Sequence, residues 1–99
     1  MDRIDHVAIQ VADIDRAVKW YTDRFDCQVD YQDKTWAFIK FANIALALVI
    51  PEQHPAHFAV LTEDAGADAA THRDGTRSVY ITDSEGNAVE LLERPPGSL

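Results

Sequence analysis

The chain has 99 residues, of which 46% are hydrophobic, so it is long enough for one globular domain with a real core. Acidic residues outnumber basic ones by 17 to 9, which gives a formal net charge of −8. Nucleic acids and anionic membranes need a basic surface on their partner. We therefore expect neither a nucleic acid nor a membrane as a partner.

The cysteine content and the start of the sequence indicate the compartment. The single cysteine, Cys27, cannot form an internal disulfide, which favours a reducing compartment. The sequence starts Met1-Asp2-Arg3 without a basic-then-apolar leader, and no apolar run approaches the roughly 18 residues of a membrane span. We expect a cytoplasmic protein in which Cys27 is a buried apolar residue rather than a nucleophile.

The first half of the chain predicts one helix among four strands. Residues 4–11 alternate as a strand, and Asp13 is placed to cap a helix over residues 14–25. We interpret the helix aromatics Trp20 and Tyr21 as core residues. Strands are then expected over residues 27–31, 35–41 and 44–50, giving the order β-α-β-β-β. On the first strand, the alternation predicts a core face of Val7, Ile9 and Val11 opposite His6, Ala8 and Gln10.

The second half resembles a shortened copy of the first. A polar connector over residues 52–56 precedes another strand led by a histidine, over residues 57–61. Residues 62–72 can form a short helix that Gly66 weakens, residues 73–75 form a turn, and one strand is expected to be missing or vestigial. The tail from residue 94 contains two prolines and is expected to be frayed.

A hairpin closes the chain, with strands over residues 78–82 and 88–92. The turn from Asp83 to Gly86 suits a type I turn with a bulge, in which Gly86 takes a positive φ. In that register Tyr80 faces Glu90. The alternation predicts a core face of Val79, Ile81, Val89 and Leu91 and a polar face of Ser78, Tyr80, Thr82 and Glu90.

These elements predict an α+β fold in a single domain, residues 1–99. We expect paired βαβββ modules that form a curved, mostly antiparallel sheet around a cleft. Module one covers residues 3–51, the shortened module two covers residues 56–93, and residues 94–99 form a tail. A shortened module leaves strand edges exposed, so we also expect a homodimer.

Three residues on these strands are candidate metal ligands. His6, His57 and Glu90 each lie on the strand face opposite the predicted core side chains. Two imidazoles and one carboxylate can hold a divalent ion and leave positions open for substrate. The alternatives are a partly exposed or hydrogen-bonded role for each histidine and solvent exposure for Glu90. His54 and His72 lie in polar loops, and we interpret both as solvated.

Three passages resemble the vicinal oxygen chelate superfamily, which includes glyoxalases, bleomycin-resistance proteins and extradiol dioxygenases. They are residues 4–21 (Ile-Asp-His-Val through Trp-Tyr), residues 55–60 (Pro-Ala-His-Phe-Ala-Val) and residues 83–91 (Asp-Ser-Glu-Gly-Asn-Ala-Val-Glu-Leu). The resemblance implies metal ligands at His6, His57 and Glu90. The strand over residues 44–50 has no carboxylate that could serve as a fourth ligand, so the three-ligand pattern of this superfamily is the closer match.

The resemblance implies a metal-dependent enzyme on a small-molecule substrate. A divalent ion (Zn, Ni, Mn, Fe or Co) would chelate substrate oxygens as a Lewis acid, in lyase, isomerase, epimerase, thiol-transferase or dioxygenase chemistry. Glu90 and Tyr80 are the candidate catalytic residues, Tyr80 as a hydrogen-bond donor or proton relay; Trp36 and Arg77 are candidate lining residues. The alternatives are a metal-free ligand-binding protein of the bleomycin-resistance type and a catalytically silent interaction domain.

Overall fold

The computed structural model describes residues 1–72 and 74–95. The chain forms two compact units. The helical unit comprises residues His6–Ala56, and the hairpin unit comprises residues Met1–Asp5 together with the chain from His57 onward. The first five residues are thus grouped with the second half of the chain. One contact that ties them there is the bond from the Leu61 amide to the Arg3 carbonyl, at 2.9 Å.

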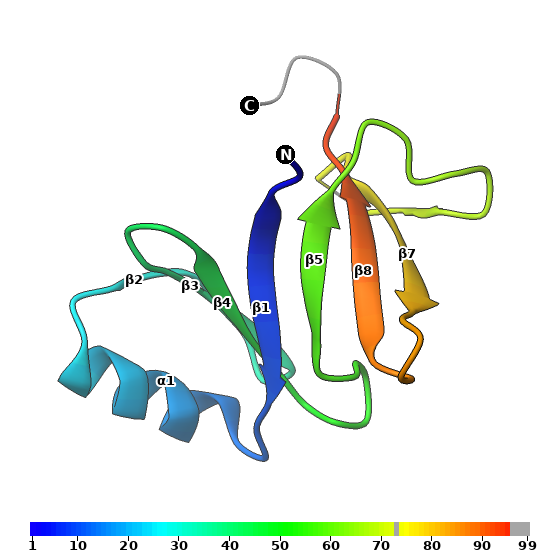
Figure 1. The fold of residues 1–99 in the computed structure, drawn as a ribbon. Helices are drawn as coiled ribbons and strands as arrows, with labels where there is room; N and C mark the ends of the chain where they lie inside the picture. Colours follow the sequence, from blue (N-terminus) through cyan, green and yellow to red (C-terminus); the bar gives the residue numbers. More distant parts are fainter. Residues whose placement is uncertain (73, 96–99) are drawn as a thin grey trace. The chain divides into compact units, whose positions relative to one another are not determined.

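The helical unit contains one helix and a four-stranded arrangement in the order β2-β3-β4-β1 (Figure 1). Strand β1 is parallel to β4, whereas β2, β3 and β4 are antiparallel neighbours. The elements are β1 (Ile4–Gln10, whose first two residues belong to the hairpin unit), α1 (Ile14–Arg24), β2 (Gln28–Gln32), β3 (Trp36–Lys40) and β4 (Ala45–Val49). They follow the predicted order, with ends that differ by one or two residues.

Helix α1 begins as predicted, because the Asp13 carboxylate accepts a bond from the Arg16 amide at 3.0 Å. The helix buries Ile14 and Val18 against Ile39 and Leu48, which are fully enclosed. Tyr21 packs against this cluster, as predicted. The prediction that Trp20 is a core residue was wrong, because 46% of its surface stays exposed beside Phe25 and Arg24.

The other face of the helical unit is also apolar, which changes the prediction for β1. Ala8 is only 2% exposed and clusters with Ala47 and Val49 under partly buried aromatic side chains. Val7, predicted to be core, is 36% exposed. Simple alternation fails here because β1 has apolar packing on both faces, as parallel strands commonly do. Cys27 is half-buried against the helix cluster, close to its predicted role.

The hairpin unit repeats the strand pattern without a helix among its described residues. Its elements are β5 (His57–Leu61), β6 (Ala70–Thr71), β7 (Arg77–Thr82) and β8 (Ala88–Glu93), in the order β5-β8-β7-β6. Strand β5 is parallel to β8, as β1 is to β4 in the helical unit. Each unit therefore has a strand led by histidine beside its last strand. The predicted α+β fold class, with a mostly antiparallel sheet, is confirmed.

The predicted short helix over residues 62–72 is absent. The strand that was expected to be missing or vestigial is vestigial, because β6 has only two residues. The Glu93 carboxylate accepts a bond from the Ala65 amide at 2.9 Å, and Arg77 donates to the Gly66 carbonyl at 2.7 Å. Gly66 itself has φ +99°, a conformation incompatible with a helix. These bonds fix an extended loop where composition alone allowed a helix.

Two other predictions lie partly outside the described residues. In the predicted turn over residues 73–75, Gly75 has φ +87° and Asp74 accepts bonds from the amide and hydroxyl of Thr76, whereas Arg73 lies outside the described part. The predicted frayed tail includes residues 96–99, which also lie outside it. Its first residue, Arg94, is paired with Asp5.

The closing hairpin has the predicted register. Tyr80 lies opposite Glu90, the Asp83 amide donates to the Asn87 carbonyl at 2.9 Å, and Gly86 has φ +87°. The predicted core face and polar face of the hairpin do not match the observed burial at three residues. Ile81 is 46% exposed, whereas Glu90 and Ser78 are 9% and 7% exposed. Strand β8 lies between β5 and β7, so side chains of both neighbouring strands, His57 and Tyr80, lie beside Glu90 and reduce its exposure.

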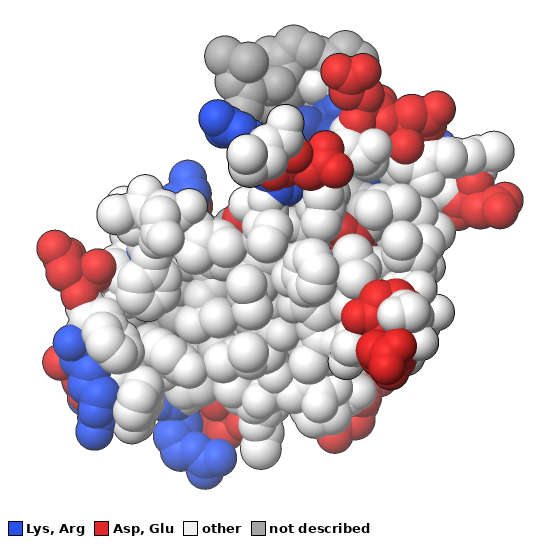
Figure 2. Space-filling view, viewed as in Figure 1, with Lys and Arg blue, Asp and Glu red and all other residues white. Residues whose placement is uncertain are grey.

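Figure 2 shows charged side chains of both signs at the lower left, over the helix of the helical unit, and acidic side chains on the right, over the hairpin unit. Within residues 1–72 and 74–95, no helix has both the length and the apolar composition needed to cross a membrane.

Replacing Gly86 by alanine tests the turn that sets the hairpin register. A Cβ at this position meets no atom within 4 Å, so only the backbone conformation resists the change. We expect Gly86→Ala to lower the free energy of unfolding by about 1 kcal/mol, measured by urea denaturation. Ser84→Ala in the same turn is the control and should leave it unchanged. Equal stability of both variants would contradict the assigned turn.

Candidate functional site

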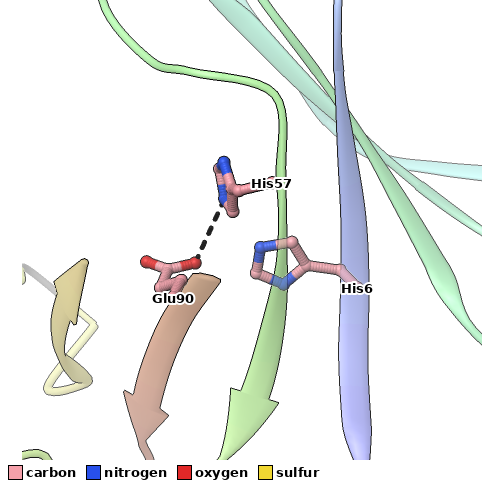
Figure 3. Close-up of side chains that lie close together, drawn as sticks. All are labelled: His6, His57 and Glu90. Atoms are coloured by element: carbon pink, nitrogen blue, oxygen red, sulfur yellow. Dashed lines mark ion pairs between the residues drawn. The ribbon is translucent and has the colours of Figure 1, made fainter. Parts of the chain in front are cut away.

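The candidate site in the hairpin unit is a histidine and a glutamate on adjacent parallel strands. His57 begins β5, and Glu90 lies in the middle of β8 opposite Ala59. Ala59, the partner of Glu90, lies two residues after His57 on β5, and residues two apart on a strand share a face. The His57 and Glu90 side chains therefore project to the same side. The His57 Nε2 and Glu90 Oε1 atoms are 3.4 Å apart (Figure 3), and their side chains are only 4% and 11% exposed.

This burial makes the pair chemically informative. An ionised carboxylate removed from water costs free energy unless a cation or hydrogen-bond donors face it. A protonated imidazole can meet that need, and so can a metal ion. Two ligand atoms at ~2.1 Å from one ion, separated by an angle of about 90–109°, lie about 3.0–3.4 Å apart. The observed Nε2–Oε1 distance fits a shared ion as well as a direct pair.

Tyr80 lies beside this pair on β7. It is the cross-strand partner of Glu90, and its ring meets the His57 ring edge to face at a centroid distance of 4.9 Å. Burial, followed by the negative charge of Glu90, raises the pKa of the Tyr80 phenol to about 12. The phenol therefore stays protonated at neutral pH, which favours a hydrogen-bond donor over a base.

His6 occupies the corresponding position in the helical unit. It lies on β1 opposite Ala45 of the parallel strand β4, as His57 lies opposite Ala88 on β8. Two residues further on, Ala8 pairs with Ala47 where Ala59 pairs with Glu90. By register, His6 thus corresponds to His57 and Ala47 corresponds to Glu90. The pattern offers a histidine in each unit but a carboxylate only in the hairpin unit.

The other sequence candidates have contacts of their own. Arg77 bonds Glu93 and the Gly66 carbonyl, so it holds the loop after β5. Trp36 belongs to an aromatic cluster in the helical unit. His72 is exposed as predicted, but its Nε2 lies 2.7 Å from the Ser78 hydroxyl; His54 is half-buried.

One contact of a site residue was not predicted. The Phe38 ring meets the His6 ring edge to face at a centroid distance of 5.4 Å. Phe38 alternates with the fully buried Ala37 and Ile39, so the pattern of β3 already placed it on the opposite face. The sequence did not show that β3 and β1 lie on either side of β4, which brings this face next to His6.

A family model matches most of the chain. The model described as "Glyoxalase/Bleomycin resistance protein/Dioxygenase superfamily" matches residues 3–71. These residues contain His6 and His57, whereas Glu90 lies beyond the matched part. Among proteins with a curated description, none matches the chain.

Solved structures share the fold at low sequence identity. A hypothetical protein from Bacillus halodurans C-125 has a TM-score of 0.79 and 13% identity, covering 99% of this chain and 98% of that one. A methylmalonyl-CoA epimerase variant from Streptomyces coelicolor, in complex with 2-nitronate-propionyl-CoA, has 0.76 and 20%, covering 95% of each chain. The Mycobacterium tuberculosis methylmalonyl-CoA epimerase has 0.71 and 21%, covering 94% and 88%. These likenesses concern the fold.

The titration of Tyr80 tests its placement beside Glu90. We expect its phenol to titrate near pH 12, measured as the difference in ultraviolet absorbance between the native chain and Tyr80→Phe. Glu90→Gln removes the second cause of the shift, so the pKa should fall but stay above the ordinary value because burial persists.

The same shift has a consequence for stability. Since the folded pKa lies above the unfolded value of 10.0, the folded state binds the proton more tightly. The stability that the raised pKa of Tyr80 contributes is fully present below about pH 10 and is lost as the pH rises through about 12. A Tyr80 that titrates near pH 10 in the folded native chain or in folded Glu90→Gln would contradict the placement.

Proposed function

The chain belongs to the Glyoxalase/Bleomycin resistance protein/Dioxygenase superfamily, and from this we propose that it is a metal-dependent enzyme acting on a small molecule. His6, His57 and Glu90 are proposed as the ligands of one divalent ion. The ion would chelate two oxygens of the substrate. The reaction belongs to the lyase, isomerase, epimerase, thiol-transferase or dioxygenase classes of this superfamily.

The observation that carries the proposal is the buried pair of His57 and Glu90. A neutral imidazole and a carboxylate are common ligands of Zn, Ni, Mn, Fe and Co, and the 3.4 Å between their atoms fits a shared ion. The carboxylate also offsets one positive charge of such an ion. A chain that only needed a stable core has little use for a charged group in the middle of a central strand.

His6 is proposed as the third ligand because of the register in which β1 pairs with β4. It occupies in the helical unit the position that His57 occupies in the hairpin unit. Ala47 stands where a second carboxylate would be expected from the same correspondence, so three protein ligands are proposed rather than four. Such a set leaves coordination positions open for substrate and water.

Glu90, His57 and Tyr80 would each have a separate role at this site. When bound, a divalent ion supplies a Lewis acid that polarises the substrate oxygens. Glu90 holds negative charge beside it, and His57 contributes a nitrogen whose ring is packed against Tyr80. Tyr80, kept protonated by its raised pKa, is proposed to donate a hydrogen bond to substrate oxygen or to Glu90.

Metal content tests the proposal directly. We expect the chain, purified without a histidine tag and exposed to Zn, Ni, Mn, Fe and Co in turn, to retain about one ion per chain of at least one of them, measured by mass spectrometry of the elements. His6→Ala, His57→Ala and Glu90→Gln should each reduce that content at least about tenfold, because each removes one of three ligands.

His54→Ala is the matched control and should leave the metal content unchanged. Far-ultraviolet circular dichroism of each variant separates loss of a ligand from loss of the fold. A well-folded native chain that takes up none of these metals would contradict the proposal and favour the alternative, a metal-free ligand-binding protein. Equal metal in the native chain and in all three variants would also contradict it.

Two further expectations from the sequence remain predictions. The homodimer and the cytoplasmic location are proposed along with the enzyme. The single cysteine, Cys27, supports a reducing compartment. Sedimentation of the purified chain measures its state of association.

A further inference from the structure

The outer side of α1 carries a tryptophan between two arginines. Arg16, Trp20 and Arg24 follow one another at intervals of four residues, so they form one line along the helix, about 12 Å long. This line is called the arginine–tryptophan stripe below. It faces away from the core, because Trp20 lies two residues after the buried Val18, on the opposite side of the helix. Trp20 keeps 46% of its surface exposed, and the guanidinium carbon of Arg24 lies 4.3 Å from the centre of its ring.

Apolar surface borders the arginine–tryptophan stripe. An open hollow of about 360 Å³ lies along it, and its lining includes Arg16 and Trp20 together with the apolar side chains of Val11 and Ala17. After the end of the helix, Phe25 is 48% exposed, and its ring lies 6.2 Å from that of Trp20. Exposed apolar surface of this kind, interrupted by a few charges, is typical of a site where another molecule binds.

The two guanidiniums of the arginine–tryptophan stripe have no carboxylate partner among residues 1–72 and 74–95. Five other cations in that part of the chain are paired with a carboxylate, namely Lys19, Lys34, Lys40, Arg77 and Arg94. Of the carboxylates on α1 and before it, Asp15 and Asp23 are used in these pairs, and Asp13 caps the helix. In a chain with a net charge of −8, the stripe therefore presents two cations to a carboxylate from another molecule.

These features favour a protein partner. Tryptophan and arginine are enriched among the residues that dominate the binding energy between proteins. A partner of matching chemistry covers Trp20 with an apolar side chain and brings one carboxylate to each arginine. A second helix does this with residues four apart, since its side chains have the same spacing as those of α1. A second copy of the chain has no such helix in its described part, where α1 is the one helix and carries the same arginines.

We propose that the arginine–tryptophan stripe docks an acidic amphipathic helix of another protein. In that helix an apolar side chain lies between two carboxylates, each four positions away, and packs along the hollow. The net charge of −8 repels the other extended anionic surface, that of a membrane. None of the three stripe residues is a proposed metal ligand, so this inference does not depend on the proposed function.

Two synthetic peptides test the proposal. Both are amphipathic helices of about 16 residues with a line of leucines, flanked four positions away on each side by glutamates in one peptide and by glutamines in the other. We expect the native chain to bind the glutamate peptide about tenfold more tightly than the glutamine peptide, measured by calorimetry. Arg16→Gln and Arg24→Gln should each reduce that ratio about threefold, because each removes one of two ion pairs.

Arg3→Gln is the matched control, since Arg3 is the other arginine without a carboxylate partner in the described part and belongs to the hairpin unit. It should keep the ratio of the native chain. Equal affinity of the native chain for both peptides, failure to bind either peptide, or the same reduction in Arg3→Gln as in Arg16→Gln would overturn the proposal.

A second measurement locates the peptide on the chain. The chain has two tryptophans, Trp20 and Trp36, so its nuclear magnetic resonance spectrum has two indole N–H signals. We expect the glutamate peptide to shift the Trp20 signal and to leave that of Trp36 in place. An unmoved Trp20 signal, or a larger shift of Trp36, would overturn the stripe as the docking surface.

The other occupants of this surface predict different results for Trp20→Leu. We expect the native chain and Trp20→Leu to have the same state of association in sedimentation, and neither to bind phosphatidylserine vesicles. Self-association that Trp20→Leu abolishes would overturn the proposal in favour of a second copy of the chain. Vesicle binding that Trp20→Leu abolishes would overturn it in favour of a membrane. Circular dichroism of each variant separates these effects from loss of the fold.

Discussion

The buried carboxylate of Glu90 is the constraint on which this structure depends. It lies in the central strand of its unit with little exposure, so its negative charge must be met by a cation or by donors. His57 is held beside it because β5 and β8 are parallel neighbours in a register that puts both side chains on one face. The turn from Asp83 to Gly86 fixes β7 against β8 and so places Tyr80 at the same point.

The repeat between the two units explains why the proposed ligands come from both halves of the sequence. In each unit a strand led by histidine is parallel to the last strand, but only the hairpin unit has the carboxylate. In the helical unit the corresponding place belongs to Ala47, and the space around it is bordered by aromatic rings. The same strand pairing thus places a charged side chain, Glu90, in one unit and an apolar side chain, Ala47, in the other.

Features set by local sequence were predictable, and features set by strand neighbours were not. The cap at Asp13 and the positive φ of Gly86 each follow from a few adjacent residues. The helix expected over residues 62–72 failed because Glu93, far along the sequence, binds the Ala65 amide. The faces of β1 and of the closing hairpin were misjudged because the burial of their side chains depends on which strands flank them. The three candidate ligands came from the resemblance and from alternation, whereas Phe38 required the strand order.

The coordination of a bound ion shows whether His6 and His57 are its ligands. X-ray absorption by the chain loaded with zinc or nickel reports the atoms around the ion. We predict scattering from two imidazole rings together with nitrogen and oxygen ligands at about 2.0–2.2 Å, and the loss of one ring in His6→Ala and in His57→Ala. An ion surrounded by oxygen alone, or a spectrum that neither variant changes, would contradict it.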